Sequence, residues 1–275
     1  MAGIYIHIPF CRKACHYCNF HFSTSQELQK DFVEALIKEI ELQKNYLKES
    51  ISTIYFGGGT PSLLPGADIQ RIIGKLSNTF EIEQEVEITL EANPDDINTP
   101  KLKEWKSFGI NRLSIGVQSF FEDDLRWMNR AHDAEQAIHC IYLAQQEGFN
   151  NLTIDLIYGT PTLSDDHWIK NIKKAIEANI PHLSCYALTV ESKTALERLI
   201  AQNKLEDVDP DKQARHFEIL TGIMEEEGYE HYEISNFARP GFRSKHNSSY
   251  WKGTPYLGLG PSAHSFNGNS RQWNI

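Results

Sequence analysis

Six short runs of β-forming residues alternate with amphipathic segments along the first two thirds of the chain. The first run covers residues 4–8, and a helical repeat follows in which Val33, Leu36, Ile37 and Ile40 recur at i, i+3, i+4 and i+7. Strands and helices in alternation favour a parallel sheet covered by helices, because parallel strands need a crossover connection, usually a helix. This alternation constrains the fold more than any other feature of the sequence.

The same patterns predict where each element begins and ends. We expect strands at residues 4–8, 51–56, 86–90, 112–117, 152–157 and 182–188, and helices at 24–47, 68–76, 99–108, 133–147, 165–178 and from 209 onwards. A capping box, Thr24-x-x-Glu27, predicts the start of the first helix. Six strands are fewer than the eight of a closed barrel, so we expect an open, partial (β/α)6 TIM-like barrel. The alternation alone also allows a doubly wound sheet.

Length and composition exclude several classes of protein. With 275 residues, 40% of them hydrophobic, the chain can form one large core; we expect a barrel at 1–190 and a C-terminal helix with a short mixed extension at 191–275. A net charge of −10 argues against non-specific nucleic-acid binding. We expect no signal peptide and no transmembrane segment, because the sequence contains no suitable apolar run. Cys140 and Cys185 lie singly in apolar runs, which indicates reduced core cysteines and a cytoplasmic protein.

Three of the five cysteines fall within eight residues, immediately after the first predicted strand. Cys11, Cys15 and Cys18 are spaced so that three sulfurs can surround one small centre. A mononuclear zinc site would take four protein ligands, or three and a water. A cubane iron–sulfur cluster held by three thiolates would leave one iron free for another ligand. The spacing by itself leaves both interpretations open.

The arrangement Cys-x3-Cys-x-aromatic-Cys resembles the cluster motif of the radical S-adenosylmethionine (SAM) superfamily. The longer strings Tyr5-Ile-His-Ile-Pro-Phe-Cys11 and Tyr17-Cys18-Asn19-Phe20 resemble one branch of it. That branch holds oxygen-independent coproporphyrinogen III oxidase and the haem chaperones of the HemW type. The resemblance implies a [4Fe–4S] cluster on Cys11, Cys15 and Cys18, whose open iron chelates SAM, and it also implies the partial barrel.

Residues with distinctive chemistry recur where the predicted strands end. The cysteine loop follows the first strand, Gly57-Gly58-Gly59-Thr60-Pro61 follows the second, Glu91 and Gln118 end the third and fourth, and Asp155 lies within the fifth. Active sites of parallel α/β barrels form at this end of the strands. The resemblance implies that the following residues bind SAM: Tyr5, Tyr17, Gly58, Gly59, Thr60, Glu91, Gln118, Arg130 and Asp155. Taken singly, each is also compatible with a structural or surface role.

The last third of the chain distinguishes the members of the branch. Lys245-His246-Asn247-Ser248-Ser249-Tyr250-Trp251 contains His-Asn-x-x-Tyr-Trp, which resembles the signature of the haem chaperone type. An imidazole beside aromatic rings can ligate haem iron, so His246 is the expected haem ligand, with His132 and His264 as weaker candidates. The oxidase type carries a fourth cysteine where this chain has Phe20. Both types normally continue beyond the point that corresponds to Ile275, so we expect their further C-terminal domain to be absent from this chain.

The leading hypothesis is a haem chaperone that binds a [4Fe–4S] cluster, SAM and haem, and delivers the haem to an acceptor protein. The alternative is an oxygen-independent coproporphyrinogen III oxidase, an enzyme of porphyrin biosynthesis that decarboxylates two propionates. A zinc-stabilised binding module without radical chemistry is the third possibility. The sequence identifies neither the acceptor nor the oligomeric state.

Overall fold

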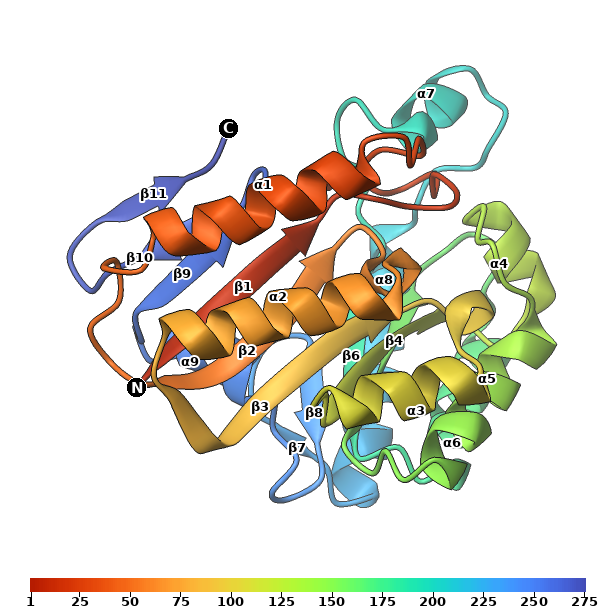
Figure 1. The fold of residues 1–275 in the computed structure, drawn as a ribbon. Coiled ribbons are helices and arrows are strands. Elements are labelled where there is room, and N and C mark those ends of the chain that lie inside the picture. The colour runs from red at the N-terminus through yellow and green to blue at the C-terminus, as the bar shows by residue number, and fades with distance from the viewer.

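Eleven strands form one sheet, and six parallel strands, β1 to β6, lie side by side at its centre (Figure 1). The computed structural model describes residues 1–275. The central strands are β1 (Ala2–Ile8), β2 (Ile51–Gly58), β3 (Ile82–Ala92), β4 (Arg112–Gln118), β5 (Leu152–Tyr158) and β6 (His182–Ala187). The sheet ends at β11 on one side and β7 on the other, so it does not close. The prediction of an open, partial barrel is confirmed.

Helices cover one face of this sheet (Figure 1). They are α1 (Gln29–Leu42), α2 (Gly66–Thr79), α3 (Thr99–Ser107), α5 (Ala134–Gln146), α6 (Asp165–Glu177) and α8 (Pro210–Glu226). Alternate residues of the central strands, such as Ile4, Ile6 and Ile8 of β1, face these helices and are fully buried. Together they form a single hydrophobic cluster of 51 residues, which fixes the helices on the strands.

The residues after β6 extend the sheet at both edges. β9 (Tyr256–Leu259) pairs in parallel with β1, and β10 (His264–Phe266) and β11 (Arg271–Trp273) follow it in antiparallel fashion. At the other edge, β8 (Asn236–Ala238) pairs antiparallel with β6, and β7 (Glu230–His231) pairs with β8. The sequence predicted a mixed extension but none of these pairings.

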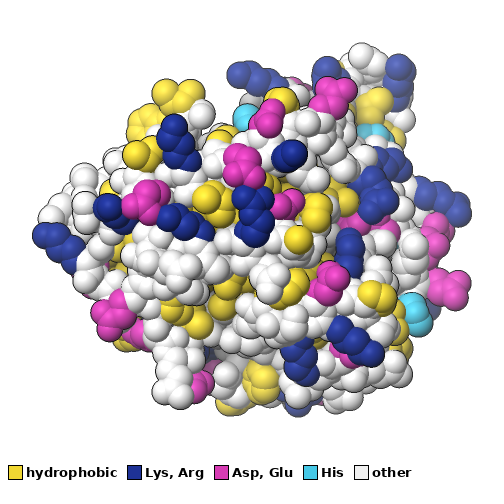
Figure 2. Space-filling model, viewed as in Figure 1, with side chains coloured by type: hydrophobic (Ala, Val, Ile, Leu, Met, Phe, Trp, Pro, Cys, Tyr) yellow, Lys and Arg dark blue, Asp and Glu magenta, His cyan; other side chains and the backbone are white.

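Shorter helices lie in the connections. They are η1 (Pro61–Leu63), η2 (Pro94–Asp96), α4 (Glu122–Trp127), α7 (Ala195–Ala201) and α9 (Lys245–Trp251). Figure 1 shows α7 beside the loop between β1 and α1, where Leu196 N–H donates to the carbonyl of His16 at 2.7 Å. No helix is both long and apolar enough to cross a membrane. Basic and acidic side chains are interspersed on the face that carries α1, α2 and α3 (Figure 2).

Two predicted boundaries are wrong for physical reasons. The expected capping box at Thr24 and Glu27 does not form, because α1 begins at Gln29 without a side-chain cap. The preceding residues instead make turns, in which Ser25 N–H donates to Ser23 Oγ at 3.1 Å. α1 also ends at Leu42 rather than near residue 47, and a turn follows in which Tyr46 N–H donates to the carbonyl of Gln43. By contrast, the cap at Asp133 is a complete capping box with Gln136.

The first prediction concerns the buried face of α1. Leu36→Ala should lower the free energy of unfolding by about 2–5 kcal/mol, because Leu36 is 1% exposed and its removal leaves a cavity under the helix. Leu42→Ala, on the same helix but 73% exposed, should change it by about 0.5 kcal/mol or less. Urea unfolding followed by circular dichroism measures both. Equal effects of the two substitutions would contradict the proposed packing of α1.

Candidate functional site

The face of the sheet opposite the helices is polar, and we call it the polar face. Because neighbouring residues of a strand point to opposite sides, the residues between the buried apolar ones form this face. Its members are Tyr5, Tyr55, Glu91, Ser114, Gln118, Asp155 and Ser184. Tyr55 Oη donates to Glu91 Oε1 at 2.8 Å, and Ser114 Oγ donates to Asp155 Oδ1 at 3.5 Å. The predicted convergence at one end of the sheet is therefore present across β1 to β5.

The cysteine loop follows β1 directly and is tied to several elements. Cys11 N–H donates to the carbonyl of Ser23 at 3.0 Å, and His16 N–H donates to the carbonyl of Met128 at 3.1 Å. Arg12 forms ion pairs with Asp95 at 3.3 Å and with Asp96 at 2.5 Å. Asp96 is buried, so this pair fixes the start of the loop beside the end of β3 more firmly than an exposed pair would. The loop is thus positioned before any cofactor binds.

The three clustered thiols are free and half-buried. Thr60 Oγ1 donates to Cys11 Sγ at 3.5 Å, and Arg130 Nη1 donates to Cys15 Sγ at 3.3 Å. Burial raises the pKa of Cys11, and burial also raises the pKa of Cys18 to about 11. Metal binding at these positions must therefore release protons from the thiols.

The spacing of the sulfurs bears on which centre they suit. No three His, Cys, Asp or Glu side chains are grouped so that they could hold a single metal ion. Mononuclear zinc needs its sulfurs about 2.3 Å from one centre, whereas cubane thiolates bind three separate irons and so lie further apart. The donor set itself, three thiols with Thr60 and Arg130 donating to two of them, is of the kind that holds an iron–sulfur cluster. The residues present therefore fit a cluster held by three thiolates.

The glycine triplet at the end of β2 is required by close contacts within the chain. A Cβ on Gly58, whose φ is +105°, would lie 2.6 Å from the His7 ring, and a Cβ on Gly59 would lie 2.7 Å from the carbonyl oxygen of Phe10. Gly58 N–H donates to Glu91 Oε2 at 3.2 Å. The triplet therefore lets β2 approach the chain after β1 and places Thr60 beside Cys11. Its contact with SAM stays a prediction.

Two carboxyls on the polar face have strongly raised pKa values. Burial raises the pKa of Glu91 to about 8, and the charge of Asp155 adds to the shift, while the hydrogen bonds from Tyr55 and Gly58 oppose it. Burial also raises the pKa of Asp155 to about 6, opposed by Ser184 and Arg130. Near neutral pH, Glu91 is thus largely protonated in the free protein. A cationic ligand group beside it would favour the carboxylate.

Arg130 lies beside the cysteine loop, and Gln118 ends β4. Arg130 donates to Asn93 Oδ1 at 2.6 Å and to the carbonyl of Gly116 at 2.8 Å, in addition to Cys15. Its Nε is buried and has no partner, which leaves one donor available to a ligand. Gln118 is buried and has a φ of +66°, which turns the chain sharply at the end of β4. Tyr17 packs against the small apolar cluster that contains Leu125 and Met128.

His246 lies toward the amino ends of β1 and β2, where its ring stacks on Tyr5 at a centroid distance of 6.4 Å. Its Nδ1 is 2.8 Å from Thr53 Oγ1 and its Nε2 is 2.9 Å from Tyr250 Oη. The ring stacks on Tyr55 at a centroid distance of 5.0 Å, and the side chain is 1% exposed. Burial lowers its pKa to about 3, so the imidazole is neutral. Both ring nitrogens are in use, and ligation of haem iron would require one hydrogen bond to break.

The sequence analysis did not single out Asn93 as a functional residue. Asn93 contacts both Arg130 and Thr60, as Nδ2 donates to Thr60 Oγ1 at 3.3 Å. The available signal was its position two residues after Glu91, which places both side chains on one face of an extended chain.

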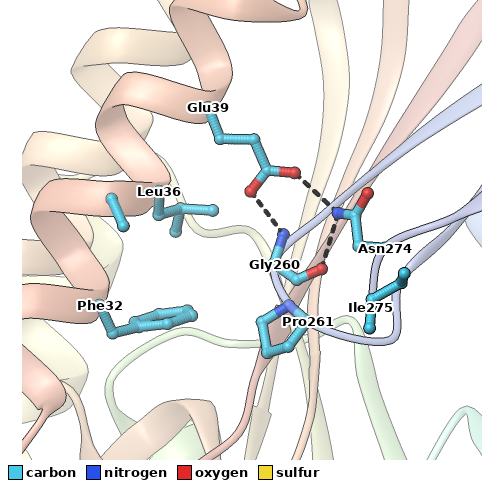
Figure 3. Close-up of a pocket in the computed structure, with 8 residues that line it drawn as sticks. Phe32, Leu36, Glu39, Gly260, Pro261, Asn274 and Ile275 are labelled. Atoms are coloured by element: carbon cyan, nitrogen blue, oxygen red, sulfur yellow. Dashed lines mark hydrogen bonds between the residues drawn. The ribbon is translucent and has the colours of Figure 1, made fainter.

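A separate pocket lies between α1 and the C-terminal residues (Figure 3). Figure 3 shows Glu39 accepting from Gly260 N–H at 3.0 Å and from Asn274 Nδ2 at 2.7 Å. Glu39, the only acidic side chain that lines the pocket, is thus already hydrogen-bonded. None of the predicted site residues lines the pocket. The pocket belongs to the helix-covered side of the sheet and is separate from the candidate site.

The second prediction concerns the protonation of Glu91. In the folded apo chain the pKa of Glu91 is about 8, against an ordinary 4.5, so between these values the folded state binds more protons than the unfolded state. Its contribution to stability therefore falls as the pH rises from 5 to 8. Glu91→Gln removes this dependence and should be more stable than wild type at pH 8, with a smaller difference at pH 5. Urea unfolding at both pH values measures it, and a difference that shrinks toward pH 8 would refute the assignment.

Comparison with known proteins agrees with this geometry. Residues 5–175 match the Radical SAM superfamily. "Heme chaperone HemW" of Mycobacterium tuberculosis (strain ATCC 25618 / H37Rv) is 36% identical over 278 residues, which are 99% of this chain and 71% of that protein. The protein of the same name from Bacillus subtilis (strain 168) is 36% identical over 100% of this chain and 73% of its own length.

A solved structure supports the same assignment. Coproporphyrinogen III oxidase (HemN) from Escherichia coli superposes with a TM-score of 0.85 and 28% identity, over 99% of this chain and 66% of the enzyme. This chain therefore spans about two thirds of the oxidase and somewhat more of the HemW relatives. The matched segment, the identity to HemW proteins and the open sheet lead to one conclusion. The chain belongs to the radical SAM superfamily and, within it, to the family of the haem chaperone HemW.

Proposed function

We propose that this protein is a haem chaperone that binds an iron–sulfur cluster, SAM and haem and delivers the haem to an acceptor protein in the cytoplasm. The observation that carries the proposal is the 36% identity to proteins named heme chaperone HemW over nearly the whole of this chain. The buried His246, in a segment that resembles the HemW signature, supports it. The barrel at 1–190 would hold the cofactors, and 191–275 would contribute the haem site.

The cofactor site would use residues that already lie together. Cys11, Cys15 and Cys18 would hold a [4Fe–4S] cluster, whose open iron, when the cluster is bound, chelates the amino and carboxylate groups of SAM. The remaining SAM contacts would come from Tyr5, Tyr17, Gly58, Gly59, Thr60, Glu91, Gln118, Arg130 and Asp155. Glu91 would pair with a cationic group of SAM and lose its proton, while Arg130 stabilises the Cys15 thiolate by a charge-assisted bond.

Haem is the proposed cargo, and His246 is the proposed iron ligand. Its neutral imidazole is the form that binds iron, and Thr53 orients the ring through Nδ1. Nε2 is the nitrogen closer to the surface, because its partner Tyr250 is 41% exposed. Movement of the Tyr250 hydroxyl would free Nε2, and the neighbouring Trp251, 70% exposed, would cover the macrocycle.

The structural likeness to coproporphyrinogen III oxidase keeps oxidation of coproporphyrinogen as the second candidate. Phe20 argues against it, because the oxidase type carries a cysteine at the corresponding position. Phe20 is 66% exposed, so a cysteine there could reach solvent or a substrate, and its replacement changes the chemistry next to Cys18. Conversion of coproporphyrinogen to protoporphyrinogen by the purified protein with SAM and reductant would favour the enzyme over the chaperone.

The third prediction tests the cluster. Anaerobic reconstitution of wild type should give about four irons per chain and the broad visible absorbance of an iron–sulfur cluster. Cys15→Ala should lose most of both, because three thiolates are needed to hold the cluster. Cys140→Ala removes a buried cysteine of α5 and should leave iron content and absorbance unchanged. Retention of zinc without iron in wild type would support the binding module instead.

The fourth prediction tests the haem ligand. His246→Gln should weaken haem binding about tenfold or more and shift the Soret band, because an amide is a poor ligand for haem iron. Tyr250→Phe should bind haem at least as tightly as wild type, since Nε2 no longer has a hydroxyl partner. His139→Gln, at an exposed position on α5, is the matched control. Unchanged affinity and Soret position in His246→Gln, with normal folding by circular dichroism, would remove His246 from the site.

A further inference from the structure

We propose that Asn93 is a positioning residue that sets the hydrogen bonding of two cluster thiolates at once and thereby raises the reduction potential of the cluster. The inference rests on the proposed function only in requiring a cluster on Cys11, Cys15 and Cys18. It depends on the contacts of a side chain that lies between the glycine loop of β2 and the loop after β4. Hydrogen bonds through Thr60, Asn93 and Arg130 connect the sulfur of Cys11 to that of Cys15.

A continuous chain of hydrogen bonds joins Cys11 to Cys15. Thr60 Oγ1 donates to Cys11 Sγ at 3.5 Å, and Asn93 Nδ2 donates to Thr60 Oγ1 at 3.3 Å. Arg130 Nη2 donates to Asn93 Oδ1 at 2.6 Å, and Nη1 of the same guanidinium donates to Cys15 Sγ at 3.3 Å. Asn93 is therefore the only link between the two donors that reach the sulfurs.

The donors in this chain can point in only one direction. Arg130 has no acceptor, so Asn93 must present its oxygen to the guanidinium and its amide N–H groups to Thr60. A hydroxyl has a single proton, and because Thr60 accepts from Asn93, that proton is directed to Cys11. Asn93 thus determines the orientation of the Thr60 hydroxyl and holds the guanidinium beside Cys15.

A hydrogen bond from the backbone of Asn93 to Ser62 holds Asn93 in place. Its N–H donates to Ser62 Oγ at 3.3 Å, and Ser62 donates to the buried carboxylate of Asp96 at 2.8 Å. The same carboxylate pairs with Arg12 of the cysteine loop. Gly116 leaves room for the contact, because a Cβ there would lie 3.2 Å from Arg130 Nη2 and 3.4 Å from Asn93 Oδ1. A preorganised amide at this position is well suited to hold two donors with small loss of entropy.

Hydrogen bonds to the sulfurs of an iron–sulfur cluster are among the factors that set its reduction potential. The reduced cluster carries one more negative charge than the oxidised cluster, so donors to its sulfurs stabilise the reduced form. Asn93→Asp keeps the size of the side chain but removes the Nδ2 donor and adds a charge. Thr60 would then donate to the new carboxylate rather than to Cys11, and Arg130 would be drawn away from Cys15. Both changes lower the potential.

The fifth prediction is a lower midpoint potential in Asn93→Asp. Anaerobically reconstituted full chains without SAM are titrated with reductant and followed by electron paramagnetic resonance. We expect the reduction equilibrium constant to fall about tenfold or more, which for a one-electron couple is about 59 mV. Asn98→Asp, which adds the same charge at the N-cap of α3 and keeps the cap acceptor, should shift the potential much less.

A neutral variant separates the hydrogen bond from the added charge. Thr60→Val removes the donor to Cys11 without a change of charge and should also lower the potential. In the Thr60→Val background, Asn93→Asp should lower the midpoint potential by less than it does in wild type. Part of its effect acts through the Thr60 hydroxyl, which this background lacks. A purely structural role would make the two shifts additive. If Asn93→Asp assembles no cluster, the midpoint potential of Thr60→Val is the test. An unchanged potential overturns the inference, because Asn93 reaches Cys11 only through the Thr60 hydroxyl.

The outcomes separate this inference from the proposed function. A wild-type chain that takes up no iron overturns the cofactor assignment and this inference with it. A normal wild-type cluster, with the same potential in Asn93→Asp and Thr60→Val, overturns the role of Asn93 alone. Equal shifts in Asn93→Asp and Asn98→Asp would likewise assign the effect to charge and overturn it.

Discussion

The structure depends on a sheet with two unlike faces. One face of β1 to β6 carries branched apolar residues that the helices bury, and the other carries Tyr5, Tyr55, Glu91 and Asp155. Since the strands are parallel, all their carboxyl ends lie at one edge, and the loops that follow them must meet there. The cysteine loop, the glycine triplet and Asn93 come together for this reason, although more than 80 residues separate Cys11 from Asn93.

The polar face carries two acidic side chains, Glu91 and Asp155, and the basic side chain of Arg130. Desolvation raises the pKa of both Glu91 and Asp155, the charge of Asp155 adds to the shift of Glu91, and Arg130 and Arg112 oppose the shift of Asp155. The Arg130 guanidinium also donates to Cys15, Asn93 and the carbonyl of Gly116. A site with an excess of acid and one spare donor on Arg130 suits a ligand such as SAM, which carries both an ammonium and a carboxylate group.

The sequence predicted features that depend on local patterns and failed where long-range contacts decide. Strand–helix alternation and the cap at Asp133 are properties of neighbouring residues, and the structure confirms them. The expected cap at Thr24 failed because that segment serves the cysteine loop, where Phe10 pairs with Ser23. His246 was expected to be a haem ligand, but its partner Thr53 is 193 residues away, so its burial could not be read from the motif. The roles of the site residues and the division near residue 190 stay predictions.

One tyrosine connects the two parts of the proposed function. Tyr55 donates to Glu91, the residue proposed to pair with SAM, and its ring stacks on His246, the residue proposed to ligate haem. If SAM binding converts Glu91 to a carboxylate, the bond from the Tyr55 hydroxyl becomes charge-assisted and stronger. The ring that packs against His246 is then held more firmly in place. Under the proposed roles of Glu91 and His246, cofactor occupancy would therefore be coupled to the geometry of the haem site through Tyr55.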